Sequence, residues 1–243
     1  MIRNMFTFDE VVKKIGENKR LILAGDEKLL SKLPAGNWMG GTIPYFMGDE
    51  GGMFSKEKIS VTELPEYVEN FDVKVYDKET IKNVYNDAPE NGFSLMLIPK
   101  YDDLLLDFAI NVPMYENFAM KPLLGWVTGM SLEDENHDKP KVYLSNTGYT
   151  DKAIVLHAVL PKNKVAEIGL INIFEQGNGD EIEFFENGFS AKEVLVNGIK
   201  TGFGEYMEKN NIDPRFPFVA DYMGVMINIG IVEKKSPSIT SIF

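Results

Sequence analysis

The stretch from Leu33 to Phe54 combines two residue types that readily build a small-molecule pocket. It holds six of the chain's 21 glycines, and four aromatic residues lie among them. Glycines let the backbone approach a ligand closely, and aromatic rings provide rigid apolar contact area. We therefore predict a ligand-binding site that is formed by Trp38, Gly40, Gly41, Thr42 and Tyr45.

The chemistry of this stretch excludes one common use of glycine-rich loops. It contains no lysine or arginine, and its glycines follow neither the spacing of a phosphate-binding loop nor that of a dinucleotide motif. The alternative to a binding site is that the rings only pack beneath a tight turn, with a short strand around residues 41–47. The sequence leaves both interpretations open.

The two histidines of the chain are its only side chains that ordinarily titrate near neutral pH. His137 lies in the acidic segment Glu133 to Asp138, where oxygen and imidazole ligands could bind a divalent cation. Because this segment lacks the glycine and the ligand order of an EF-hand, a solvated loop is favoured. His157 lies inside the apolar segment 153–160 and is predicted to be a buried, hydrogen-bonded structural residue.

No arrangement typical of catalysis is present. The chain has no cysteine, which excludes thiolate nucleophiles, disulfides and cysteine-ligated metals. It also has no Gly-x-Ser-x-Gly elbow and no HExxH helix. We predict no catalytic residue, no cofactor and no metal site, and a non-catalytic protein. An enzyme that uses carboxylates or a metal near residues 133–138 stays an alternative.

The charge of the chain restricts its partners and its compartment. Its 37 acidic residues against 25 basic ones give a net charge of -12, which would repel nucleic acid and anionic membranes. Apolar runs such as 153–160 and 225–232 are too short for a membrane helix, and the first residues lack a secretory apolar region. We expect a cytoplasmic protein that binds neither nucleic acid nor membrane.

Helix and strand signals alternate in the first half of the chain. Thr7 and Glu10 form a capping pattern that predicts a helix ending near Gly16, and Asp26 is placed to cap a second, short helix. Further helices are predicted over Asp77 to Tyr85 and from Asp102 to Pro113. Apolar runs predict strands between them at residues 20–25, 58–62, 73–76 and 93–98.

The pattern after Leu123 consists mostly of strand-length segments. They cover residues 123–130, 141–144, 152–160, 165–174, 181–185 and 222–232, with one helix near 201–209. The predicted class is α/β in the broad sense of mixed α+β, with mixed β-sheets layered with helices, β/α units first and a β-rich C-terminal half. Two subdomains, 1–130 and 141–243, or one continuous domain fit this order.

Two motifs together resemble the FIST family of bacterial sensory domains. One is Gly40-Gly41-Thr42 after an early β/α unit, and the other is Glu193 to Met207, with Asn197, Gly198 and Tyr206, followed by Phe216-Pro217-Phe218. Lys200-Thr201 replaces the usual Pro-Ala pair, and the chain is shorter than a full FIST module. The resemblance implies a small-molecule ligand, a sensory role and a signalling protein partner. A purely structural interaction subunit is the remaining alternative.

Overall fold

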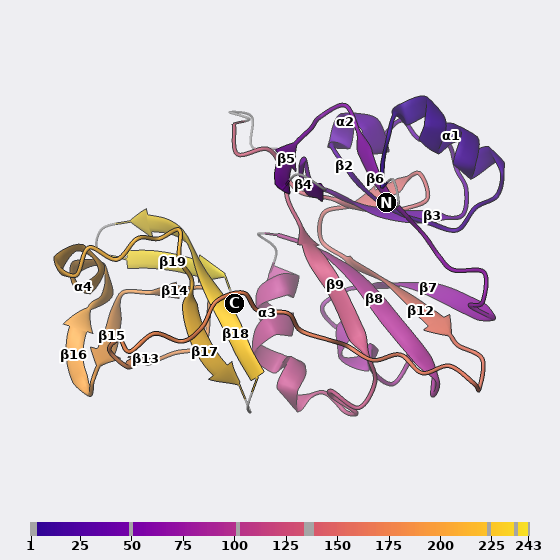
Figure 1. The fold of residues 1–243 in the computed structure, drawn as a ribbon. Helices are drawn as coiled ribbons and strands as arrows, with labels where there is room; N and C mark the ends of the chain where they lie inside the picture. The colour runs from indigo at the N-terminus through magenta and orange to yellow at the C-terminus, as the bar shows by residue number, and fades with distance from the viewer. Residues whose placement is uncertain are drawn as a thin grey trace. The chain divides into compact units, whose positions relative to one another are not determined.

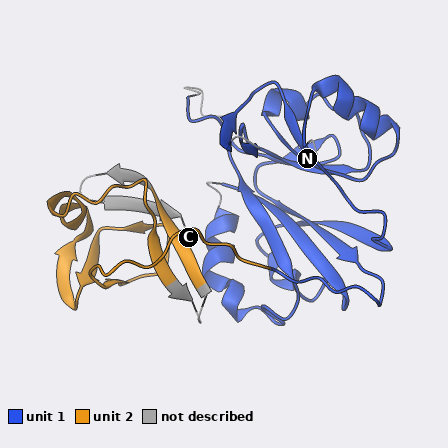
Figure 2. Ribbon diagram, viewed as in Figure 1, with its two compact units in different colours: residues 1–168 blue, residues 169–243 orange. Residues whose placement is uncertain are grey.

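The computed structural model describes residues 4–48, 51–100, 103–133, 139–222, 225–235 and 238–242. The chain divides into two compact units, Met1–Ile168 and Gly169–Phe243, coloured separately in Figure 2. Each unit combines β-sheets with helices, which confirms the predicted mixed class.

Unit 1 contains two large β-sheets and one separate two-stranded hairpin. The first sheet has the strand order β1-β6-β2-β3-β10-β11, and the second has the order β7-β12-β8-β9. The strands of the first sheet are β1 (Met5–Phe6), β2 (Leu21–Gly25), β3 (Trp38–Thr42), β6 (Ile59–Glu63), β10 (Val142–Leu144) and β11 (Thr147–Tyr149). Those of the second are β7 (Asn70–Tyr76), β8 (Gly92–Pro99), β9 (Leu123–Thr128) and β12 (Ala153–Val159). The hairpin of β4 (Tyr45–Gly48) and β5 (Gly51–Phe54) pairs separately.

Each sheet contains one parallel pair of strands joined by a helix. In the first sheet β2 and β3 are parallel, and α2 (Glu27–Leu30) connects them. In the second sheet β8 and β9 are parallel, and α3 (Asp103–Asn111) connects them, followed by the 3-10 turn η2 (Val112–Met114). The other pairings within the two sheets are antiparallel. Unit 1 is therefore built on two β/α/β crossovers.

Helix α1 (Phe8–Gly16) shows how local sequence fixes these elements. The Thr7 hydroxyl accepts from the backbone N–H of Glu10, and the Glu10 carboxylate accepts from the backbone N–H of Thr7, which satisfies two otherwise free donors. Val11 and Ile15, four residues apart, then lie buried on one face of the helix. That face packs onto the first sheet.

The layers of unit 1, visible in Figure 1, are held together by three apolar clusters. Helices α1 and α2 cover one face of the first sheet, around Leu23 and Trp38. The opposite face of the first sheet packs on the second sheet, through residues such as Met39 and Leu156. Helix α3 and η1 (Ile81–Asn83) cover the outer face of the second sheet. The result is a helix, sheet, sheet, helix sandwich.

Unit 2 has its own small core. Its strands are β13 (Ile182–Phe184), β14 (Ser190–Ala191), β15 (Glu193–Val196), β16 (Ile199–Gly202), β17 (Phe218–Tyr222), β18 (Val225–Lys235) and β19 (Ser238–Ile242). They form the sheets β13-β15-β16 and β14-β19-β18-β17. Asn197 and Gly198 both have positive φ in the two-residue turn between β15 and β16. Helix α4 (Phe203–Lys209) places Phe203 and Met207 against Val194.

Three features differ from the sequence-based predictions. The division follows residue 168 rather than residues 131–140, because β10 pairs with β3 and β12 pairs with both β7 and β8. The helix expected over Asp77 to Tyr85 is reduced to the three residues of η1. The strand expected over residues 165–174 is absent, and this segment has no regular secondary structure.

Candidate functional site

A cavity of about 90 Å³ lies between the two sheets of unit 1, at the amino ends of β2 and β3. Both sheets supply its wall, and most of the lining side chains are apolar. Apolar lining with few polar groups is typical of small-molecule sites. The apolar lining includes Ile22, Trp38, Met39, Phe71, Val73 and Leu156.

Arg20 is the only charged residue among those that line the cavity. Its Nη1 donates to the carbonyl oxygen of Val68 at 3.2 Å, and its guanidinium carbon lies 5.0 Å from the centre of the Phe71 ring. No carboxylate of the described residues lies within ion-pair distance of it. The adjacent Lys19, in contrast, forms an ion pair with Glu63 at 2.8 Å.

Trp38 is the one predicted site residue that the cavity contacts. It is 3% exposed, its Nε1 donates to the carbonyl oxygen of Pro34 at 2.8 Å, and its ring stacks on Tyr143 with centroids 6.2 Å apart. Burial, together with the neighbouring Glu27 carboxylate, raises the pKa of Tyr143 to about 12, so its phenol stays protonated. The ring of Trp38 therefore packs in the cluster beneath α1 and α2, on the face of the first sheet opposite the second sheet, and Trp38 borders the cavity at the start of β3.

The other four predicted site residues lie away from the cavity lining. Gly40 and Gly41 are buried inside β3. The Thr42 hydroxyl accepts from the backbone N–H of Lys141 at 2.9 Å. The Tyr45 hydroxyl accepts from the backbone N–H of Leu132 at 3.0 Å, so this hydroxyl also has a hydrogen-bond partner within the protein.

Two buried polar atoms of β9 lie close to Gly41 of β3. A Cβ at this position would lie 2.5 Å from Cγ2 of Thr128 and 3.3 Å from Nε1 of Trp126. Within the described part of the chain, the buried Trp126 Nε1 and Thr128 Oγ1 have no hydrogen-bond partner. The absence of a side chain at Gly41 thus allows β9 to approach β3.

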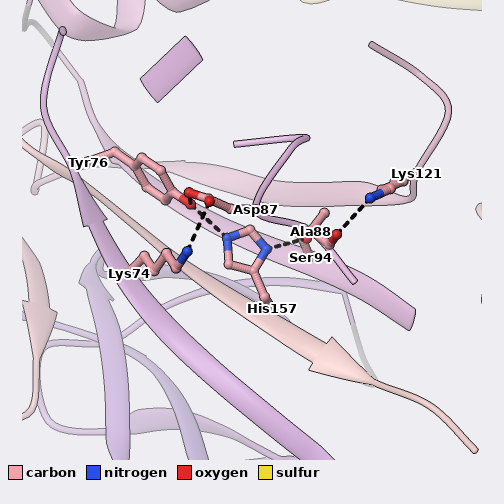
Figure 3. A network of polar contacts seen from close by, with 7 residues as sticks. All are labelled: Lys74, Tyr76, Asp87, Ala88, Ser94, Lys121 and His157. Atoms are coloured by element: carbon pink, nitrogen blue, oxygen red, sulfur yellow. Dashed lines mark hydrogen bonds and ion pairs between the residues drawn. The ribbon is translucent and has the colours of Figure 1, made fainter. Parts of the chain in front are cut away.

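His157 lies in a buried hydrogen-bonded network on the outer face of the second sheet (Figure 3). Tyr76 Oη donates to Oδ2 of Asp87 at 2.8 Å and lies 2.9 Å from Nε2 of His157. Nδ1 of His157 lies 2.7 Å from Oγ of Ser94. Lys74 completes the network with an ion pair to Asp87 at 3.0 Å.

The protonation of this network follows from its charges. Burial raises the pKa of the Asp87 carboxyl, but the hydrogen bond from Tyr76 and the Lys74 ammonium outweigh burial and lower that pKa overall. Burial lowers the pKa of His157 and raises that of Tyr76. A neutral His157 therefore donates from Nε2 to Tyr76, whose own proton goes to Asp87, and its Nδ1 accepts from Ser94.

This network resembles part of a catalytic relay in its residue types but not in its accessibility. Ser94 is 1% exposed and His157 4% exposed, so a substrate has no access to either in this structure. Both ring nitrogens of His157 are hydrogen-bonded. The prediction that His157 is buried and hydrogen-bonded is confirmed.

The predicted metal alternative falls largely outside the described residues. Residues 134–138, including His137, are not described, and Glu133 is exposed. Elsewhere in the described ranges, no three histidine or acidic side chains are grouped closely enough to hold a metal ion. None of the described helices has the length and hydropathy needed to cross a bilayer.

Sequence reasoning missed Arg20, Phe71 and Val73 as cavity residues. Arg20 directly precedes an apolar strand, and the other two belong to a strand about fifty residues later. Only the packing of the two sheets brings them together. No local pattern in the sequence signals that contact.

Comparison with known proteins gives one match. The family described as "Family of unknown function (DUF6976)" matches residues 6–240, a range that includes nearly all of both units. No curated protein and no solved structure matches the chain. The motifs that resemble FIST domains therefore remain a sequence-based prediction.

Proposed function

We propose that this chain, which belongs to the DUF6976 family, binds a small, largely apolar molecule in the cavity beside Trp38. In this proposal the protein is a non-catalytic, ligand-responsive protein of the cytoplasm. The observation that supports it is the cavity itself, which is lined by both sheets of unit 1 and has an apolar wall.

The size of the cavity limits the part of a ligand that it can enclose. The volume of about 90 Å³ is smaller than that of an engineered cavity of roughly 150 Å³ that binds benzene in another protein. A side chain of three or four carbons fits this range. Larger ligands would keep part of their surface in solvent.

A sensory role is the second part of the proposal. It is supported by the resemblance of Gly40-Gly41-Thr42 and of the Glu193 to Met207 motif to FIST domains. It is also supported by the position of the cavity, because a ligand there would contact β2 and β3 on one side and β7 and β12 on the other. Ligand binding would thus stabilise the contact between the sheets, and a signalling protein partner would detect this change.

Tryptophan fluorescence offers a direct test. The chain has two tryptophans, and the Trp126→Phe variant would leave Trp38 as the sole emitter. Because Trp126 Nε1 has no partner among the described residues, this substitution loses no hydrogen bond there. A panel of small metabolites should contain compounds that change Trp38 emission and raise the melting temperature, since a ligand stabilises the state that binds it.

A matched pair of variants would place the binding site. Val73 lines the cavity, whereas Val75, two residues along the same edge strand, is half-buried in the same intersheet cluster but does not. Val73→Phe should fill the cavity and abolish the ligand response, and Val75→Phe should retain it. A panel that changes neither the emission nor the melting temperature would overturn the proposal, as would equal responses in the two variants.

A further inference from the structure

We infer that the ligand of this cavity is a short aliphatic carboxylate and that Arg20 binds its carboxylate group. This inference rests on the proposed function and adds the chemical class of the ligand. It depends on the charge, the fixed position and the surroundings of Arg20.

Among the described residues of this acidic protein, Arg20 has no carboxylate partner. The chain carries 37 acidic and 25 basic residues, yet no described carboxylate lies within ion-pair distance of Arg20. The nearby Glu63 pairs instead with Lys19 at 2.8 Å and Lys14 at 3.5 Å, and the hydrogen bond from Lys19 lowers the pKa of Glu63. Glu63 is therefore engaged elsewhere, and an external anion can pair with Arg20.

Two contacts hold the guanidinium in place. The Phe71 ring lies beneath it, with 5.0 Å between the guanidinium carbon and the ring centre, and the Val68 carbonyl accepts from Nη1. One of the five N–H donors of the guanidinium is thereby used, and the others have no partner among the described residues. A guanidinium held in this way is suited to a two-pronged hydrogen bond with a carboxylate.

The residues that line the cavity around Arg20 indicate the chemistry of the rest of the ligand. Arg20 is the only charged side chain in the lining, and the amide of the adjacent Asn37 donates to Asn18 at 2.7 Å. The wall beyond Arg20 is apolar and has room for about three or four carbons by the volume argument. A single negative charge with a short alkyl chain matches both parts. The net charge of -12 would oppose ligands with several negative charges.

The test compares acids with uncharged ligands of the same shape. Butyrate, valerate and isovalerate would be titrated into the Trp126→Phe chain, each beside its primary amide, while Trp38 emission and the melting temperature are recorded. We expect at least one acid to bind at least tenfold more tightly than its amide. We also expect this preference to weaken as salt is added, because salt screens the partly exposed ion pair.

Variants of Arg20 identify the group responsible. Arg20→Gln should remove the preference for acid over amide, and Arg20→Lys should retain part of it because the charge remains without the planar fork. Arg215→Gln is the matched control, because Arg215 pairs with Asp213 on the exposed surface of unit 2. The control should bind as the parent does. Melting temperatures would show whether each variant is folded.

The outcomes separate this inference from the proposed function. If amides bind as tightly as acids, or if Arg20→Gln keeps the preference, the carboxylate inference is wrong and the cavity remains a binding site. If none of the three acids binds, the inference also fails, whatever else the cavity accepts. If neither these compounds nor the metabolite panel binds, both proposals fail. Should Arg20→Gln not fold, the acid and amide comparison on the parent chain still decides.

Discussion

The phenol oxygen of Tyr76 lies 2.9 Å from Nε2 of His157, across the boundary between edge strand β7 and its neighbour β12. Because the Tyr76 proton goes to Asp87, His157 must be the donor in this contact. Burial lowers the pKa of His157, so the imidazole is neutral and carries its proton on Nε2. Protonation of His157 in acid would remove the acceptor at Nδ1, so the hydrogen-bonded network is sensitive to low pH.

We predict that unit 1 loses stability in acid through His157. Burial lowers the pKa of His157, an effect increased by Lys74 and Lys121 and opposed by Asp87 and Asp72. The unfolded chain therefore takes up this proton at a higher pH than the folded chain does. The contribution of His157 to the free energy of unfolding is complete above pH 6.5, the ordinary pKa of histidine. This contribution is lost as the pH falls through the lower pKa of the folded state.

Urea unfolding between pH 8 and pH 5 would measure this effect. One proton contributes a slope of at most about 1.4 kcal/mol per pH unit, and His157→Gln should remove that part of the slope while other groups keep theirs. Equal slopes in the parent and the variant would show that His157 does not carry the acid sensitivity.

A second prediction concerns the Ser94 hydroxyl. Ser94→Ala leaves Nδ1 of the buried His157 without its donor, which should lower the free energy of unfolding by about 1–3 kcal/mol. Ser31→Ala is the control, because the exposed Ser31 makes no side-chain hydrogen bond in the described structure. The control should change stability by less than about 0.5 kcal/mol. A loss as small as that in Ser94→Ala would argue against this hydrogen bond.

The third prediction concerns the close approach of β3 and β9. Gly41→Ala would bring a methyl group 2.5 Å from Cγ2 of Thr128, so we expect a loss of about 1–3 kcal/mol. Thr128→Ser removes that Cγ2 and should restore much of the loss in the double variant. Gly52→Ala, where no atom lies within 4 Å of the added Cβ, is the control.

A double-mutant cycle in urea would measure the coupling between positions 41 and 128. Additive losses would mean that the added methyl group does not press on Thr128. A loss in Gly52→Ala as large as that in Gly41→Ala would point to backbone effects of alanine instead of the contact.

The sequence predicted elements whose signals are local. The Thr7 and Glu10 capping box predicted α1, and Asp26 predicted the start of α2, because both caps form between residues two or three apart. The helix expected over Asp77 to Tyr85 was wrong. Its apolar residues Ile81, Val84 and Tyr85 are buried, but only residues 81–83 form the 3-10 turn η1, and Val84 and Tyr85 lie in the turn that follows.

Elements that depend on distant partners were less predictable. Residues 165–174 have the composition of a strand, yet Val165, Ile171 and Ile173 are 84%, 95% and 84% exposed, and the segment pairs with no described strand. A strand-like sequence favours an extended backbone, but a strand forms only where a neighbouring strand is available to pair with it. The same limit applies to the cavity, where Trp38 was predicted from composition and Arg20 was not.

The central position of β12 has a consequence for the order in which the protein can fold during synthesis. β12 is hydrogen-bonded to β7 on one side and to β8 on the other, and it ends at Val159. Until the ribosome has delivered that strand, β7 and β8 have no common neighbour and the second sheet cannot close. The nascent chain must therefore carry an unfinished apolar surface until Val159 has been added, a stage at which chaperones commonly act.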